Sequence, residues 1–216
     1  MRVAVMQPYL YPYPLYFHLI ASVDLFILFD CVQFPRRGRI HRAPLPEDGW
    51  LTLPLARQPR DTMIEDLRFA TDASQRWSQR LAALPWLSEE MVETLSAPFA
   101  DGVTAYLDGQ LARACAMLGI KTPIRRSSDL ALPPDLRGQD RVIAAARAAE
   151  GKTYVNLPGG RDLYNAATFR DHALRLAFLA PYTGTRFSML HAFSTEPIHA
   201  LRAELAQLPP PEEVQH

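Results

Sequence analysis

The residues with the most evident chemistry form a short basic segment. Four arginines fall within the seven residues 36–42, and the stretch 31–46 contains no Asp or Glu. Guanidinium groups packed this closely repel one another unless an anion or acidic side chains neutralise them. We therefore expect a binding site for a small anionic substrate, a phosphate or a carboxylate, with Arg37 and Arg42 as its main contacts. A solvated turn whose arginines pair with acids elsewhere in the chain is the alternative.

Asp30 and His18 are the candidates for proton transfer. Asp30 ends the apolar segment VDLFILFD, six residues before the arginines, so it could act as a general base or accept a hydrogen bond from a substrate hydroxyl. It could equally be a structural partner of Arg42. His18 follows two aromatic residues, where a histidine is more often a hydrogen-bonded part of the core than a proton-transfer group.

Cys31 and His41 offer a second chemistry, nucleophilic catalysis. A thiol beside a basic segment can be activated as a thiolate, with His41 or His18 as its base. The neighbouring arginines should depress the pKa of His41 and keep its imidazole neutral at pH 7. A single cysteine that follows a buried strand is, however, commonly inert.

Polar residues and glycines elsewhere complete the predicted binding site. Gln7, Tyr9 and Gln33 lie in the segments that follow the first two predicted strands, and their side chains could fix polar groups of a substrate. Gly159 and Gly160 could let backbone amides approach a phosphate or carboxylate at the start of a helix. A tight turn from strand to helix would need the same glycines.

The elements that must position these residues begin with a βαβ unit. The residue pattern predicts strands at 2–6 and 25–28 with a helix at 16–21 between them, which implies a parallel sheet. Ligands of such sheets bind beyond the carboxyl ends of the strands, which here means segments 7–14 and 30–42.

The rest of the chain predicts more α/β structure with a helical insertion. Apolar runs at 50–55 and 63–69 predict a hairpin or edge pair, and helices follow within 72–118. The later elements expected are a strand at 122–126, a helix at 138–150, a strand at 153–155, a helical turn from Gly159, a strand at 174–179 and a helix at 195–208. We expect an α/β fold with a largely parallel sheet and helices on both faces, in a single domain 1–208 with a flexible tail at 209–216.

Composition narrows the class of partner. The chain of 216 residues has 23 basic and 23 acidic side chains and a formal net charge of zero, which gives no reason to expect nucleic acid as a partner. Cys31 and Cys115 are the only cysteines, too few for a disulfide scaffold or a structural zinc site, and no metal site is evident. No stretch approaches the ~18 apolar residues of a membrane span, and the first residues lack a signal peptide. We expect a cytoplasmic protein without membrane insertion and leave its oligomeric state open.

Several motifs, taken in order, resemble the WbqC-like family of bacterial surface-polysaccharide (O-antigen) and related biosynthetic gene sets. The segment MQPYLYPYPLYFHLI is similar to the family's opening motif, and DLFILFDCVQF resembles its second strand with the acidic pair that follows. The segments that then follow in the family's order and spacing are RRGRIHR, WLTLPL, GIKTPIRRSSDL, RGQDRVI and YVNLPGGRDLY. The resemblance runs over nearly the whole chain.

Three departures from the family pattern concern the site. Cys31 stands where the family has its second acid, so either a two-carboxylate site is lost or a thiol replaces an oxygen ligand. His41 replaces the usual Asn. Ser188 and His191 lie at the place of a Leu-Ser-Ile-Ile-Asp motif, with His191 in place of the Asp, and the resemblance suggests both as substrate-binding residues.

The resemblance implies a biosynthetic transferase that moves an acyl or aminoacyl group onto an amino sugar or a similar small molecule, forming an amide. The co-substrate could be activated as a nucleotide or a thioester. A nucleotidylyltransferase-like enzyme is an alternative, because a strand, a proline-rich loop, a helix and a strand also open that fold, although residues 16–18 supply only one of its two histidines. The third hypothesis is a non-enzymatic ligand-binding module.

Overall fold

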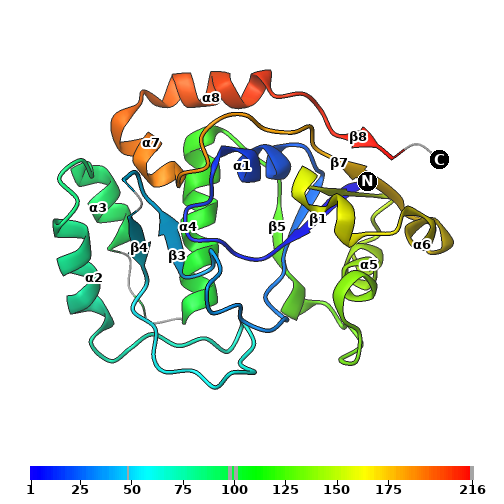
Figure 1. Ribbon diagram of the computed structural model, residues 1–216, viewed down its shortest axis with the longest axis horizontal. Coiled ribbons are helices and arrows are strands. Elements are labelled where there is room, and N and C mark those ends of the chain that lie inside the picture. The colour runs from blue at the N-terminus through cyan, green and yellow to red at the C-terminus, as the bar shows by residue number, and fades with distance from the viewer. Residues whose placement is uncertain (48, 97–98, 100–101, 215–216) are drawn as a thin grey trace.

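A six-stranded, mostly parallel sheet lies at the centre of the computed structural model, which describes residues 1–47, 49–96, 99 and 102–214 (Figure 1). The strand order is β5-β2-β1-β6-β7-β8, and only the β7–β8 pair is antiparallel. The strands are β1 (Arg2–Met6), β2 (Leu25–Leu28), β5 (Ile124–Arg126), β6 (Thr153–Asn156), β7 (Arg175–Phe178) and β8 (Glu212–Glu213). The predicted α/β class and its opening βαβ unit are confirmed.

The direction in which successive strands are added reverses once, beside β1. From β1 the chain passes through α1 (Pro14–Ala21) to β2, which pairs with β5, and it later returns to the other side of β1 as β6. β1 and β6 are neighbours in the sheet, and Val3 of β1 lies opposite Tyr154 of β6. Because the chain leaves β1 and β6 in opposite directions, a crevice opens beyond their carboxyl ends.

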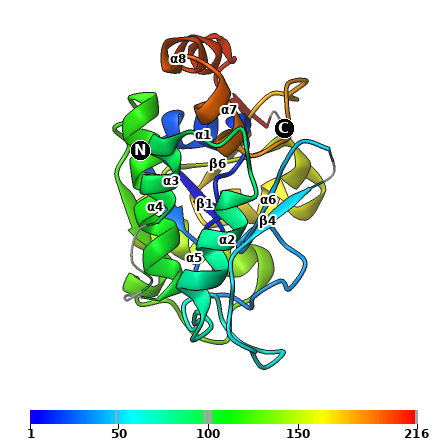
Figure 2. The same cartoon turned by 90° about the vertical axis from the view of Figure 1, so that its left-hand side faces the viewer.

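The two faces of the sheet bury separate sets of side chains. Ala4, Phe26 and Leu28 pack on one face, whereas Val3 and Ile27 pack on the other, as the alternation along a strand requires. The helices of the first face are α1, α4 (Val103–Leu118), α7 (Met189–Thr195) and α8 (Ile198–Gln207), and those of the second are α5 (Gly138–Ala148) and α6 (Ala166–Asp171). Figure 2 shows α8 lying outside α1 and α4, which it contacts. Helices therefore cover both faces, as predicted.

The helical insertion predicted at 72–118 contains α2 (Ala73–Ala82), α3 (Glu89–Leu95) and α4, although its residues 97–98 and 100–101 lie outside the described part. The pairing predicted just before it, of residues 50–55 with the run 63–69, is confirmed at a single bridge, between Leu55 and Phe69. Trp50–Thr52 (β4) pairs instead with Arg42–Pro44 (β3), and the other end of the run 63–69 forms an isolated bridge with Gln33. Exposed charged residues interrupt that run, namely Glu65, Asp66 and Arg68, so it has no continuous apolar face to bury.

The C-terminal region differs from the sequence-based expectation in two ways. The helix expected at 195–208 is α8, which begins at Ile198 because Pro197 is its N-cap and does not lie in its first turn, and the preceding helix α7 was not expected. The tail expected to be flexible at 209–216 supplies β8, and Val214 N donates to the Leu176 carbonyl at 2.9 Å. The edge of β7 offers unpaired backbone groups for this contact. Residues 215–216 lie outside the described part.

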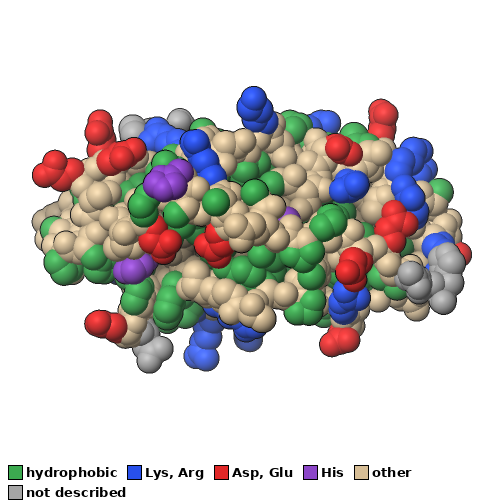
Figure 3. Space-filling view, turned by 90° about the horizontal axis from the view of Figure 1, so that it is seen from above, with side chains coloured by type: hydrophobic (Ala, Val, Ile, Leu, Met, Phe, Trp, Pro, Cys, Tyr) green, Lys and Arg blue, Asp and Glu red, His purple; other side chains and the backbone are tan. Residues whose placement is uncertain are grey.

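The surface on the side of α7 and α8 carries charges of both signs, interspersed rather than gathered into one field (Figure 3). This distribution agrees with the zero net charge of the sequence. A small anion would therefore need a local group of arginines rather than a broad basic surface.

Candidate functional site

The candidate site is a pocket of about 530 Å³ in the crevice beyond the carboxyl ends of β1 and β6. Four tyrosines and two arginines dominate its wall: Tyr9, Tyr13, Tyr164, Tyr182, Arg39 and Arg186. Gln7 and Asn156 add amide groups at the ends of the two strands. Its volume falls within the range of about 300–1,000 Å³ that is usual for small-molecule sites.

The proline-rich loop after β1 is held in place by hydrogen bonds at three points. The Gln7 carbonyl accepts from the buried Tyr16 hydroxyl at 2.7 Å, and Leu10 N donates to the Arg39 carbonyl at 3.0 Å. Tyr11 has a positive φ of 40° and its hydroxyl donates to Gln110 Oε1 at 2.8 Å. A residue other than glycine seldom adopts this conformation, so the contacts fix an otherwise unfavourable backbone. The loop thus presents its side chains to the pocket from a rigid base.

The opposite wall is a tight turn that follows β6. Asn156 Oδ1 accepts from Leu157 N at 2.7 Å, and the backbone at Gly160 passes close to the same side chain. A Cβ at position 160 would lie 2.6 Å from Asn156 Nδ2, whereas one at Gly159 would meet nothing within 4 Å. Both predicted glycines therefore line the pocket, and Gly160 is required there for close approach to Asn156.

Of the four clustered arginines, the pocket wall includes Arg39. Its guanidinium carbon lies 5.3 Å from the ring centroid of Tyr13, and Nη1 donates to the Arg186 carbonyl at 3.2 Å. The predicted contacts are turned elsewhere: Arg37 is exposed, and Arg42 lies 4.6 Å from the Trp50 ring centroid and donates to the Arg37 carbonyl. Neither of these two lines the pocket.

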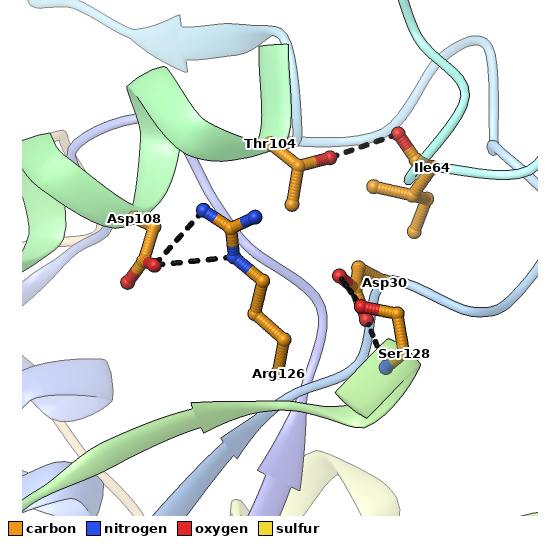
Figure 4. Close-up of polar contacts among 6 residues, drawn as sticks. All are labelled: Asp30, Ile64, Thr104, Asp108, Arg126 and Ser128. Atoms are coloured by element: carbon orange, nitrogen blue, oxygen red, sulfur yellow. Dashed lines mark hydrogen bonds and ion pairs between the residues drawn. The ribbon is translucent and has the colours of Figure 1, made fainter. Parts of the chain in front are cut away.

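Asp30 lies at the end of β2 in a second polar cluster, outside the pocket (Figure 4). It is 1% exposed, and its carboxylate accepts from Ser127 Oγ at 2.7 Å and from Ser128 N and Oγ at 2.9 and 2.7 Å. Figure 4 also shows Arg126 directed at Asp108 of α4, with which it forms an ion pair at 3.1 Å. The Asp30 carboxylate thus joins the end of β2 to the turn after β5, and it does not bind Arg42.

The other predicted catalytic residues are dispersed. Cys31 is buried with Sγ 3.0 Å from Ser127 Oγ, and His18 Nε2 lies 2.9 Å from the Pro209 carbonyl. His41 packs against Phe34 with ring centroids 5.1 Å apart, and its Nδ1 is buried without a partner among the described residues. Burial, with a smaller effect of Arg42, lowers the pKa of His41 to about 4, so the imidazole is neutral at pH 7 as expected. None of the three lines the pocket.

The remaining predicted binding residues support neighbouring structure. Gln33 donates to the Arg60 carbonyl at 2.9 Å, and the His191 ring lies 4.9 Å from that of Trp86. Ser188 caps α7 and donates to the Tyr11 carbonyl at 2.6 Å, which ties the segment before α7 to the loop after β1. Of the predicted site residues, the pocket includes Gln7, Tyr9, Gly159 and Gly160.

Apart from its two arginines, the titratable side chains of the described pocket lining are tyrosines. Its described lining contains no Asp, Glu, His, Lys or Cys. The Tyr182 hydroxyl donates to Glu204 Oε1 of α8 at 3.0 Å, and burial together with this carboxylate raises the pKa of Tyr182. Burial also raises the pKa of Tyr13, against the opposing influence of Arg39 and Arg186. Glu204 lies behind the wall, and its hydrogen bond with the Tyr182 hydroxyl gives a proton a route from the pocket to this carboxylate.

Sequence reasoning missed the tyrosines 13, 164 and 182, together with Asn156, Arg39 and Arg186, as site residues. The rule that ligands bind beyond the carboxyl ends of parallel strands would locate these residues, but only once β6 is known to lie beside β1. The described residues contain no group of three or more His, Cys, Asp or Glu that could hold a metal ion. No helix of the described chain has the length and apolarity needed to cross a membrane.

Fold and pocket together define a doubly wound α/β protein with a pocket at the reversal of its strand order, the place where such sheets bind ligands. The model of the WbqC-like protein family matches residues 7–192, and the chain belongs to this family. A relative, the uncharacterized protein Rv1507c of Mycobacterium tuberculosis, is 26% identical over 203 residues, which cover 86% of this chain and 84% of the relative. No solved structure matches the chain.

Proposed function

We propose that the protein is a biosynthetic transferase whose small anionic substrate binds in the pocket beyond the carboxyl ends of β1 and β6. The group transferred is acyl or aminoacyl, and it passes to the amine of an amino sugar or a similar small molecule. The observation that carries this proposal is the composition of the pocket wall, with four tyrosines, two arginines and no carboxylate among its described residues. Tyrosine rings offer both an apolar face and a hydroxyl to a polar ring, while arginines attract an anion.

Amide formation requires a proton acceptor, and Tyr182 with Glu204 suits this role. The amine nitrogen attacks the acyl carbon, the new C–N bond forms, and the bond from carbon to the activating oxygen or sulfur breaks. The proton lost by the nitrogen passes to the Tyr182 oxygen as the Tyr182 proton passes to Glu204, which accepts it along the existing 3.0 Å hydrogen bond. Asp30 takes no part in this step, because it lies outside the pocket wall, although its neighbour Phe29 belongs to it.

A nucleotidyl-transfer enzyme is the second candidate, and one observation favours it. The strand order β5-β2-β1-β6-β7 reverses at the pocket, and doubly wound sheets bind mononucleotides at such a position. The first helix gives this candidate less support, since His18 contacts the Pro209 carbonyl and does not line the pocket.

The test is a thermal-shift panel of nucleotide sugars, ATP with Mg²⁺, CoA thioesters and carrier-bound acyl groups, followed by mass spectrometry of incubations with each stabilising pair. The proposal expects the acceptor to gain the mass of the acyl or aminoacyl group. Release of pyrophosphate together with a nucleotidyl adduct would establish the second candidate. Recovery of both ligands unchanged after long incubation would instead indicate a ligand-binding module.

A further inference from the structure

The pocket carries positive charge that the described residues do not neutralise. Arg39 and Arg186 both lie in its wall, and neither forms an ion pair with a described carboxylate. Two arginines in a pocket wall without acids give the pocket a positive potential, which attracts an anion. The charge of the pair is therefore informative about the ligand.

The two arginines come from segments far apart in sequence, and the Arg39 side chain joins these segments by a hydrogen bond to the backbone of Arg186. Arg39 Nη1 donates to the Arg186 carbonyl at 3.2 Å, so the guanidinium of Arg186 is not needed for this contact. The Tyr13 side chain lies within the influence of both charges, because Arg39 and Arg186 each act to lower its pKa against the larger effect of burial. Three donors from three segments thus approach one part of the pocket.

We infer that Arg39, Arg186 and Tyr13 form a subsite for the phosphoryl or diphosphoryl group of the substrate. This inference rests on the proposed function and decides between the two anions that the sequence left open. A carboxylate is planar, carries one charge, and is already matched by the fork of a single arginine, so the second arginine would stay unneutralised. A phosphate monoester carries a charge of about −1.5 to −2 at pH 7 and has three strong acceptor oxygens that can serve donors from several directions.

The rest of the pocket suits the remainder of such a substrate. Tyr9 and Tyr164 supply further rings, and Gln7 and Asn156 supply amides, so a ring with hydroxyl or amino groups would find both packing and hydrogen bonds. The substrate class is therefore a phosphorylated or nucleotide-linked ring compound, with the amine or the acyl group toward Tyr182.

Phenyl phosphate and benzoate are matched probes for this subsite, because both present an anion on the same ring. Binding is measured by isothermal titration calorimetry or ligand-observed NMR at constant ionic strength and neutral pH. We expect phenyl phosphate to bind at least about tenfold more tightly than benzoate, a difference of about 1.4 kcal/mol. The preference should shrink as the pH falls through about 6, where a phosphate monoester becomes a monoanion.

The variant Arg186→Gln keeps the backbone acceptor of the Arg39 contact and should bring the two affinities close together. Arg186→Lys keeps the charge and should retain part of the preference. The control Arg147→Gln removes an exposed arginine of α5 outside the pocket and should leave the preference unchanged. Since Arg186 is exposed, its replacement should leave the melting temperature unchanged.

Equal binding of the two probes, or a phosphate preference that survives in Arg186→Gln, would overturn the phosphoryl subsite. Tighter binding of benzoate that depends on Arg186 would also overturn it, while leaving the proposed transferase with a carboxylate substrate. The transfer assay tests the proposed function separately. Acyl transfer between unphosphorylated compounds would support the proposed function and contradict the phosphoryl subsite.

Discussion

Two polar clusters lie at carboxyl ends of the same sheet, and they differ in how far their polar groups are already satisfied. At the ends of β2 and β5, the Asp30 carboxylate is 1% exposed and accepts three hydrogen bonds from serine groups. At the ends of β1 and β6, Arg39 and Arg186 have no carboxylate partner among the residues described. The groups of the first cluster are satisfied within the fold, whereas the second cluster retains the charge and hydrogen-bonding capacity that the proposed ligand would need. The type of a residue and its position at the end of a strand therefore do not show whether it stabilises the fold or is available to a ligand.

The strongest test of this comparison is the Asp30→Ala variant. It leaves the Ser127 and Ser128 hydroxyls and the Ser128 N–H without their buried acceptor, so we expect the free energy of unfolding to fall by about 3 kcal/mol. Urea denaturation measures this loss. Phenyl phosphate binding by the fraction that stays folded should change by less than about twofold. A stable Asp30→Ala protein that has lost binding would reverse the two roles.

The Tyr182→Phe variant probes the second cluster, the pocket at the ends of β1 and β6. If Tyr182 accepts the proton of the amine, kcat for acyl transfer should fall by about a hundredfold with little change in KM, and Glu204→Gln should act in the same direction. The measurement is single-turnover mass spectrometry with the substrate pair found in the transfer assay.

Two further variants test whether the position and the surrounding charge of Tyr182 affect transfer. Gly184→Ala keeps both proton-carrying groups but adds a Cβ that clashes with the Tyr182 ring, so it should also lower kcat. The control is Glu196→Gln, since Glu196 influences Tyr182 only through its charge and should have a small effect. Full kcat in Tyr182→Phe would remove Tyr182 from the mechanism.

His41 extends the comparison to a buried polar atom, its Nδ1, which has no hydrogen-bond partner in the described part of the chain. Burial lowers its pKa to about 4 in the folded protein, below the ordinary value of about 6.5 for an unfolded histidine. The unfolded chain therefore binds more protons between these values, and the folded state loses stability as the pH falls through this window. We expect His41→Asn to reduce the pH dependence of the unfolding free energy by about 1–2 kcal/mol between about pH 7 and pH 4. Denaturant titrations at several pH values measure it, and parallel curves for the two proteins would contradict the assignment.

Asp108→Ala should have the smallest effect. Its ion pair with Arg126 lies near Asp30, but the two side chains are 31% and 33% exposed, so water already compensates much of their charge. The free energy of unfolding should fall by less than about 1 kcal/mol, and high salt should reduce the difference. A loss as large as that of Asp30→Ala would mean that exposure does not distinguish these carboxylates.

The sequence predicted the elements that are encoded locally. β1 and β2 are short, mainly apolar runs, β6 contains the strand-favouring types Thr, Tyr and Val, and the spacing of apolar positions placed most helices correctly. The position of β6 beside β1 was not predictable in this way, because strand adjacency depends on contacts between residues about 150 positions apart. Without that neighbour, the segments after β1 and β2 were expected to form the site together.

The choice among the clustered arginines shows the same limit at the level of side chains. Residues 36–42 have no helical or strand periodicity before β3, so the sequence does not say which guanidinium points to which side. Arg42 packs on Trp50 because β4 pairs beside it, and Arg39 reaches the pocket because the loop after β1 binds its carbonyl. His18, by contrast, fits the expectation for a histidine beside two aromatic residues, since it is buried and hydrogen-bonded.

The short strand β8 has a practical consequence for handling this protein. It fixes the chain that leaves α8, and α8 carries Glu204 beside Tyr182. A tag fused directly after Val214, or a deletion beginning at Pro209, would disturb that attachment and uncover the edge of β7. Loss of activity or aggregation in such a protein would then reflect its engineering rather than its chemistry, so affinity handles belong at the other terminus, where Met1 is exposed.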